Sequence, residues 1–191
     1  MQYWIAGAVV AVPVLLLLGC LPPAPPAVPG KRESQTAVAG MPIAVEKVEE
    51  LGIYLSGEKE VHKPQADEIV EITGLLLGIL PELNLQAMCL FRDADVARMR
   101  EEGDSLELVF AQPVDMTITQ RIEENDRDHI PTDERGYRVL RLKRALFVLG
   151  GEMAGHVLIR GEGQDWGCWA IEREGEIDAR WIEAVEEVLE E

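Results

Sequence analysis

The segment SLELVFAQPVDMTITQR, residues 105–121, contains two runs in which apolar and polar side chains alternate. The apolar positions of the two runs are Leu106, Leu108, Phe110, Val114, Met116 and Ile118. A repeat of two residues is typical of a β-strand that buries one face and exposes the other. Gln112 and Pro113 separate the runs, and they form either a tight turn between two strands or a bulge in one bent strand.

The residues that follow also predict strands. After the polar segment 123–136, three strand-like runs cover YRVLRLKRALFVL (137–149), GHVLIRG (155–161) and WGCWAIER (166–173). Glycine-rich turns separate these runs. Connections this short join antiparallel neighbours, because a parallel pair needs a crossover of about a dozen residues or more. The second half of the chain therefore predicts an antiparallel sheet.

A helical repeat marks the segment PQADEIVEITGLLLGILPEL, residues 64–83. Its apolar residues at helical spacing are Ile69, Ile72, Leu76, Ile79 and Leu83. Pro81 is expected to kink or end this helix, because proline lacks the N–H that the helix needs. Gly74 and Gly78 share one helical face, which we interpret as a close approach of the helix to a sheet.

The remaining elements are shorter. A first strand is expected over 43–56, and a short buried strand over 86–91. Residues 93–103 predict a short helix with an aspartate cap, and residues 176–191 predict a C-terminal helix that Asp178 can cap. The expected buried stripe of this last helix consists of Trp181, Ile182, Val185, Val188 and Leu189.

Together these elements predict an α+β fold. We expect an antiparallel sheet of about five to seven strands, with the long helix of the N-terminal half and the C-terminal helix packed on one face. Residues 41–191 are expected to form a single acidic domain, because about 150 residues are enough for one ordinary core.

The first twenty residues have the character of an export signal. An apolar run from Ile5 to Leu18 ends just before a cysteine, in Leu17-Leu18-Gly19-Cys20. This stretch resembles the signal peptide and lipobox of prokaryotic lipoproteins. The resemblance implies that Cys20 is lipidated and becomes the mature N-terminus, which anchors the protein in the cell membrane with its domain outside the cytoplasm. The alternative is an uncleaved membrane anchor, which also exports residues 31–191.

Residues 21–40 are expected to form a tether without a fixed fold. Five prolines lie in its first part, namely Pro22, Pro23, Pro25, Pro26 and Pro29. Proline fixes φ and donates no backbone hydrogen bond, so the segment favours an extended spacer of about 3 Å per residue. Such a spacer can hold the domain away from the lipid surface.

The formal net charge of −17 restricts the partners of the domain. Nucleic acid is not expected as a partner, because phosphate binding needs clustered Lys and Arg side chains. The acidity also argues against a domain that lies flat on an anionic bilayer. Its simplest interpretation is solubility, and adaptation to high salt gives the same composition.

The chain offers little support for catalysis or metal binding. His62, His129 and His156 are scattered singly, and none has a second histidine or a cysteine at ligand spacing. We therefore expect no cofactor, no metal and no catalytic residues. Cys89 and Cys168 remain once Cys20 is lipidated, and they form either a disulfide or two buried thiols.

A basic cluster stands out in this acidic chain. It consists of Arg135, Arg138, Arg141, Lys143 and Arg144, of which the last four are the candidate contact residues. These side chains either contact a partner or form ion pairs with neighbouring acidic residues. Trp166 and Trp169 would point to opposite faces of a strand, which makes Trp166 a candidate contact residue or a second core residue.

These features lead to a functional hypothesis. The protein is expected to be a membrane-anchored extracytoplasmic lipoprotein that acts as a binding or structural accessory module, with an envelope protein as partner. One alternative is a secreted hydrolase whose acidic residues converge only in the fold. Another is an accessory subunit that binds through an exposed strand edge.

Overall fold

A computed structural model describes residues 43–55 and 57–190, so the leader and the tether lie outside the described residues. Its elements, in chain order, are the 3-10 helix η1 Val45–Lys47, β1 Val48–Leu55, β2 Glu58–His62, α1 Asp67–Ile79, η2 Leu80–Glu82, β3 Leu85–Phe91, α2 Asp93–Glu102, β4 Ser105–Arg121, η3 Glu124–Asp126, β5 Tyr137–Val148, β6 His156–Arg160, β7 Trp166–Ala170, β8 Glu172–Arg173, β9 Glu176–Ile177 and α3 Trp181–Leu189.

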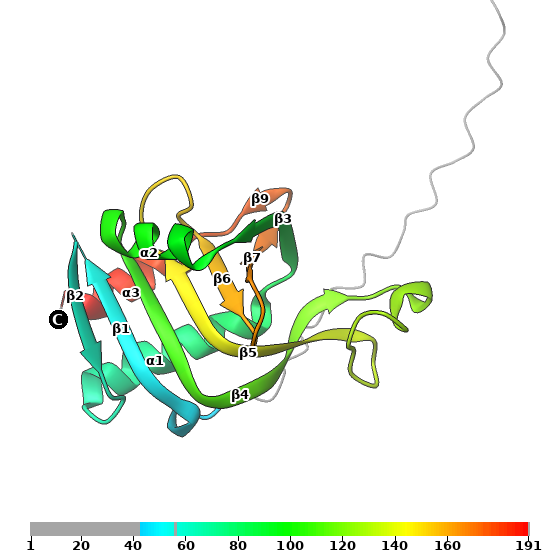
Figure 1. Cartoon of the computed structure of the whole chain (residues 1–191), viewed down its shortest axis with the longest axis horizontal. Helices are drawn as coiled ribbons and strands as arrows, with labels where there is room; N and C mark the ends of the chain where they lie inside the picture. Colours follow the sequence, from blue (N-terminus) through cyan, green and yellow to red (C-terminus); the bar gives the residue numbers. More distant parts are fainter. Residues whose placement is uncertain (1–42, 56, 191) are drawn as a thin grey trace, which may run out of the picture. The chain divides into compact units, whose positions relative to one another are not determined.

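In the described residues, seven strands form one sheet in the order β2-β1-β4-β5-β6-β7-β3 (Figure 1). Every neighbouring pair is antiparallel. Strands β8 and β9 form a separate short hairpin. The predicted α+β class and antiparallel sheet are therefore confirmed. None of the described helices is both long and apolar enough to cross a membrane.

Strand β4 resolves the alternatives for Gln112 and Pro113. They lie inside one long strand, β4. The pairing of β4 with β5 shifts register around them, between Val109↔Arg144 and Val114↔Leu142. This register shift is a bulge, because β4 has more residues than β5 between the two paired positions. Lys143 stabilises it, since its ammonium group donates hydrogen bonds to the carbonyl oxygens of Phe110 and Ala111.

The strand expected over 43–56 corresponds to β1, which begins only at Val48, after η1. A second strand, β2, follows it and was not predicted from the sequence. Its residues, EKEVH, are mostly exposed and show no apolar alternation. An edge strand needs no buried face, so backbone pairing with β1 alone defines it. Gly57 takes the positive φ of +81° that the tight turn between the strands requires.

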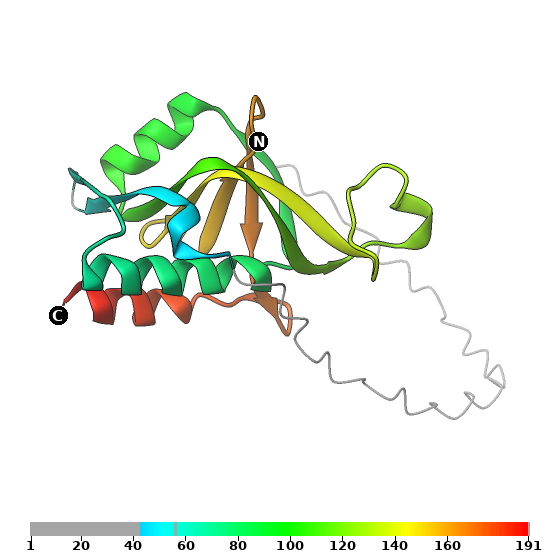
Figure 2. The same cartoon turned by 90° about the horizontal axis from the view of Figure 1, so that it is seen from below.

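The main core lies between the sheet and two helices, α1 and α3, which run side by side along one face (Figure 2). Leu108 and Phe110 of β4 and Phe147 of β5 are fully buried there, facing Leu76 of α1. Trp181 of α3 meets Phe147 edge to face, with ring centroids 5.8 Å apart. Burial of such side chains contributes about 1.5–3 kcal/mol each.

A second, smaller core covers the opposite face of the sheet, where α2 packs (Figure 2). Val96 of α2 and Leu146, Leu158, Trp166 and Cys168 of the sheet are all buried in it. Helices therefore lie on both faces of the sheet. This second core explains why β5, β6 and β7 read as continuous apolar runs, since both of their faces are covered.

Three local expectations are wrong. Gly74 and Gly78 do not approach a sheet, because both are exposed and a Cβ atom at either would meet no residue of the described part of the chain within 4 Å. Strand β3 is not buried but lies at the sheet edge, with Met88 fully exposed and Leu90 71% exposed. Asp178 does not cap α3, whose N-cap residue is Arg180.

The expected aspartate cap of α2 also differs. The N-cap residue is Arg92, whose backbone N–H donates to Asp95 in the first turn. Asp93 instead accepts hydrogen bonds from the indole of Trp166 and the guanidinium of Arg160. The pKa of Asp93 is lowered first by the Trp166 bond and then by the charge of Arg160.

Candidate functional site

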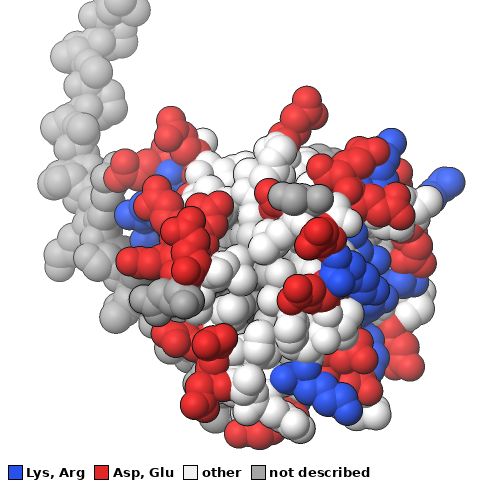
Figure 3. Space-filling model, turned by 90° about the vertical axis from the view of Figure 1, so that its left-hand side faces the viewer, with Lys and Arg blue, Asp and Glu red and all other residues white. Residues whose placement is uncertain are grey.

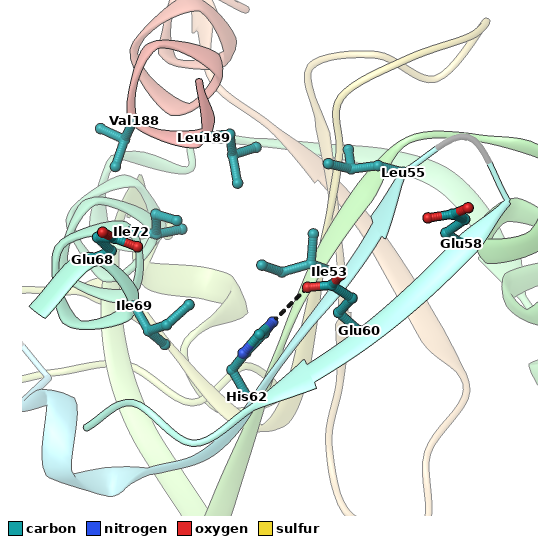
Figure 4. A pocket seen from close by; sticks show the side chains of 10 residues that line it. All are labelled: Ile53, Leu55, Glu58, Glu60, His62, Glu68, Ile69, Ile72, Val188 and Leu189. Carbon is teal, nitrogen blue, oxygen red and sulfur yellow. Dashed lines mark hydrogen bonds and ion pairs between the residues drawn. The ribbon is translucent and has the colours of Figure 1, made fainter. Parts of the chain in front are cut away.

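A cleft of about 330 Å³ opens between β2, α1 and α3. Its lining residues are Ile53, Leu55, Glu58, Glu60, His62, Glu68, Ile69, Ile72, Val188 and Leu189. Figure 4 shows these side chains around the cleft, drawn from three separate parts of the chain. The cleft therefore exists only after the hairpin and both helices have packed together.

The floor of the cleft is apolar. Ile53 and Leu55 come from β1, Ile69 and Ile72 from α1, and the last turn of α3 adds Val188 with its neighbour Leu189. Apart from the buried Ile72, these side chains are half-buried against the main core. Their remaining surface faces the cleft, where it can accept an apolar group.

The rim of the cleft is acidic because of the register of the hairpin. Leu55 pairs with Glu58, Ile53 with Glu60, and Leu51 with His62, so the three polar residues of β2 share a face with apolar residues of β1. The Nε2 atom of His62 lies 3.0 Å from a carboxylate oxygen of Glu60.

Glu68, in the first turn of α1, supplies a third carboxylate, and no Lys or Arg is among the described residues that line the cleft. Figure 3, seen from the left-hand side of Figure 1, shows an uncharged area with acidic side chains on both sides of it, and groups of basic side chains farther to the right and at the lower edge. This combination suits a group that is apolar along its length and carries a positive charge at one end.

The basic cluster predicted from the sequence is held largely by internal contacts. Arg144 pairs with Glu107 across β4 and β5 at 2.8 Å, and Lys143 binds the β4 bulge. Arg138 donates to the side-chain oxygens of Gln86 and Gln120 and lies over the Trp169 ring at 4.7 Å. Burial lowers the pKa of Arg138.

Arg141 is exposed and stands opposite Asp115 in the register of β4 and β5. Together with Arg138 it lines a second hollow of about 810 Å³, which also borders Asp115 and Asp165. Two positive and two negative side chains therefore face this hollow. It has no charge preference of the kind that the β2–α1–α3 cleft shows.

Trp166 is not available as a contact residue, because only 1% of its surface is exposed. The guanidinium groups of Arg100, Arg144 and Arg160 lie 5.6–5.9 Å from its ring centroid, and α2 packs over it. The alternation of the strand correctly placed Trp166 and Trp169 on opposite faces. Both are buried, since the sheet is covered on both sides.

Glu107 pairs with Leu146 of this second core in the register of β4 and β5, and its side chain is 1% exposed. Its carboxylate lies 2.7 Å from Arg100 and 2.8 Å from Arg144, and it accepts a hydrogen bond of 3.1 Å from the Tyr54 hydroxyl. The pKa of Tyr54 is raised first by burial and then by the charge of Glu107.

The two cysteines come close together on β3 and β7, and both are free thiols. Burial, and next the neighbouring Cys89 thiol, raise the pKa of Cys168 to about 12. The three histidines stay on separate elements: His62 on β2, His156 at the start of β6, and His129 in the loop after η3. Across residues 43–55 and 57–190, no group of three or more His, Cys, Asp or Glu side chains could hold a metal ion.

Sequence reasoning missed the cleft because it missed β2. The predicted elements left Glu58 and Glu60 unassigned, between the first strand and the long helix, and only their pairing with β1 places them beside Ile53 and Leu55. The available signal was a glycine turn followed by the alternating Glu58-Lys59-Glu60, directly after a predicted strand.

The sequence and the fold of this chain were also compared with those of known proteins. No family model, no curated protein and no solved structure matches the chain.

Proposed function

We propose that this protein is a lipid-anchored extracytoplasmic binding module, and that its β2–α1–α3 cleft binds a cationic segment of a partner protein. The observation that carries the proposal is the composition of the cleft. An apolar floor is bordered by Glu58, Glu60 and Glu68, with no Lys or Arg among its described lining residues.

A Lys or Arg side chain matches this cleft in two ways. Its aliphatic stem can cover the apolar floor while its charged end stays at the acidic rim. A cleft of about 330 Å³ has room for one or two such side chains but not for a large cofactor. The net charge of −17 adds a long-range attraction that speeds the approach of a basic partner.

The hydrolase alternative also requires converging acids, and the cleft brings three together. However, Glu58, Glu60 and Glu68 are all exposed to solvent. A carboxyl group that transfers protons near neutral pH is usually buried beside apolar groups or a like charge, which raises its pKa. Exposed carboxylates suit charge recognition better, so binding is the preferred function.

The membrane anchor belongs to the same proposal. The apolar leader that ends at Cys20 and the proline-rich tether support it, and both lie outside the described residues. A lipidated Cys20 would keep the cleft within reach of basic segments in other proteins of the cell envelope.

Charge-neutral variants test the cleft. We propose to measure the binding of a fluorescent peptide of alternating Lys and Leu to the full-length chain in a non-ionic detergent. The variant Glu58→Gln/Glu60→Gln/Glu68→Gln should bind the peptide about tenfold more weakly or worse, since each factor of ten corresponds to about 1.4 kcal/mol.

A matched variant controls for total charge. Glu101→Gln/Glu162→Gln/Glu183→Gln removes the same charge from exposed residues that do not line the cleft. It should bind the peptide almost as well as the unmodified chain. Equal weakening in both variants would mean that the peptide responds only to net charge, and the proposal would be wrong.

A further inference from the structure

Cys89 and Cys168 lie on neighbouring antiparallel strands and on the same face of the sheet. Ala87 of β3 pairs with Cys168 of β7, and the register then slips so that Leu90 pairs with Gly167. Cys89 therefore sits in a bulge of β3, beside Cys168. Both side chains belong to the core under α2, where Cys168 is fully buried and Cys89 partly buried.

The two thiols are close enough to influence each other. Burial is the main reason that the pKa of Cys168 rises to about 12, and the neighbouring Cys89 thiol raises it further. Cys89 is the more accessible of the two. It is thus the thiol that an external oxidant would reach first.

We propose that Cys89 and Cys168 form a disulfide between β3 and β7 when a small disulfide oxidant is present. In the first step, the thiolate of Cys89 attacks one sulfur of the oxidant and releases one thiol. In the second step, Cys168 loses its proton and attacks the Cys89 sulfur, which releases the second thiol. The oxidant gains two electrons and two protons, and the protein loses two hydrogen atoms.

The bond would secure a weak point of the sheet. Among the described strands, β3 is the last of the order and pairs only with β7, across a slipped register. A covalent link here ties the edge to the sheet and closes a long loop of the chain, which limits the unfolded state. Its formation in the cell rests on the proposed export, but the proximity of the thiols does not depend on the cleft or its ligand.

The test uses the full-length chain with Cys20→Ser, so that Cys89 and Cys168 are its remaining thiols, and glutathione disulfide as the oxidant. Intact mass should fall by two hydrogen atoms without an added glutathione, and digestion should yield one peptide pair joined through Cys89 and Cys168. The oxidised protein should also melt at a higher temperature than the reduced protein. Two thiols that both stay free, or a stable glutathione adduct on Cys89, would overturn the proposal.

Two matched variants test whether the bond requires a thiol on the same face of the sheet as Cys168. Cys89→Ser/Ala87→Cys places the thiol opposite Cys168 on the same face, and it should still form the bond. Cys89→Ser/Met88→Cys places the thiol at the fully exposed Met88 position, and it should give a glutathione adduct instead. A Met88→Cys variant that bridges to Cys168 as fast as the unmodified pair would contradict the proposed geometry. The mass measurement keeps both Cys89 and Cys168, so its result stands even if the Ala87→Cys or Met88→Cys variant fails to fold.

Discussion

Glu107 is the buried charge on which the core under α2 depends. Because side chains alternate along β4, Glu107 points to the other face of the sheet from Leu106 and Leu108. In an antiparallel sheet that face is commonly exposed to solvent. Because α2 covers that face, Glu107 is buried with Arg100 and Arg144 as its counter-ions. A buried carboxylate is tolerated only when paired charges and hydrogen bonds compensate for its lost hydration.

The variant Glu107→Gln should destabilise the protein by about 3 kcal/mol, because it leaves two guanidinium groups without their counter-ion. The value lies at the low end of the range for broken buried pairs, since the Arg144 side chain is 35% exposed and partly hydrated. Urea denaturation measures the change. Glu101→Gln, at an exposed position on α2, should change stability by less than about 0.5 kcal/mol. Equal effects of the two variants would rule out the pairing.

Asp178 links the β8–β9 hairpin to the start of α3 and makes stability depend on pH. Its carboxylate accepts hydrogen bonds from the side chain and backbone of Arg180, and it also pairs with Arg173 at 2.7 Å. The hydrogen bond from the Arg180 side chain is the main reason that the pKa of Asp178 falls from 3.8 to about 2.

A carboxyl group with a lowered pKa in the folded state stabilises the protein above its unfolded pKa, and this contribution is lost as the pH falls through the folded pKa. The unmodified chain should therefore exceed Asp178→Asn in stability above about pH 4, and the difference should disappear between about pH 4 and pH 2. Denaturation of both proteins across this range measures it. A difference that does not change with pH would contradict the assignment.

At the scale of elements, α1 has a buried apolar face and an exposed side that carries two glycines. Ile72, Leu76 and Ile79 belong to the main core, as the apolar repeat predicts. Thr73 and Leu77 are buried as well, although the repeat did not include them. Gly74 and Gly78 lie on the outer side of α1, where no described residue comes within 4 Å of an added Cβ atom. Glycine in an exposed helical position lowers the stability of the folded state, because it gives the unfolded chain more conformational freedom.

Gly74→Ala should therefore stabilise the protein by about 0.5–1 kcal/mol, which thermal or urea unfolding can detect. Gly155→Ala is the contrasting variant. Gly155 has a φ of +84°, and a Cβ atom there would lie 2.8 Å from the Cβ of Ala179, so this variant should destabilise the protein. If Gly74→Ala destabilises instead, the outer side of α1 must be covered by a neighbour.

At the scale of the whole molecule, the described core is self-contained. The residues of the main core run from Ile43 in front of η1 to Val185 in α3. A fragment of residues 41–191 should therefore be soluble and should unfold in a single cooperative transition, because it keeps every described core residue. Circular dichroism during urea titration tests this. Aggregation of the fragment would show that residues before 41 contribute to the fold.

The anchor makes a separate prediction. Cys20→Ser should abolish incorporation of labelled fatty acid and should release the domain from the membrane fraction, because the proposed lipid would be attached to the Cys20 sulfur. A variant that stays in the membrane without lipid would support the uncleaved anchor instead. Either result leaves the cleft and the thiol pair to be tested on their own.

The sequence by itself determined the class of the fold and most of its elements. Strand and helix periods and short glycine turns are local signals, so they predict β4 to β7, α1 and α3 before any contact is known. The same signals indicated an antiparallel sheet, because short turns exclude crossovers. They also placed Trp166 and Trp169 on opposite faces of one strand.

Only the tertiary structure decided which faces and edges are covered. A polar strand such as β2 has no period of its own, and its pairing with β1 creates the acidic rim of the cleft. Likewise, the edge position of β3 and the packing of α2 over Glu107 depend on distant parts of the chain. A local pattern shows which side chains share a face, whereas burial depends on the neighbour that packs against that face.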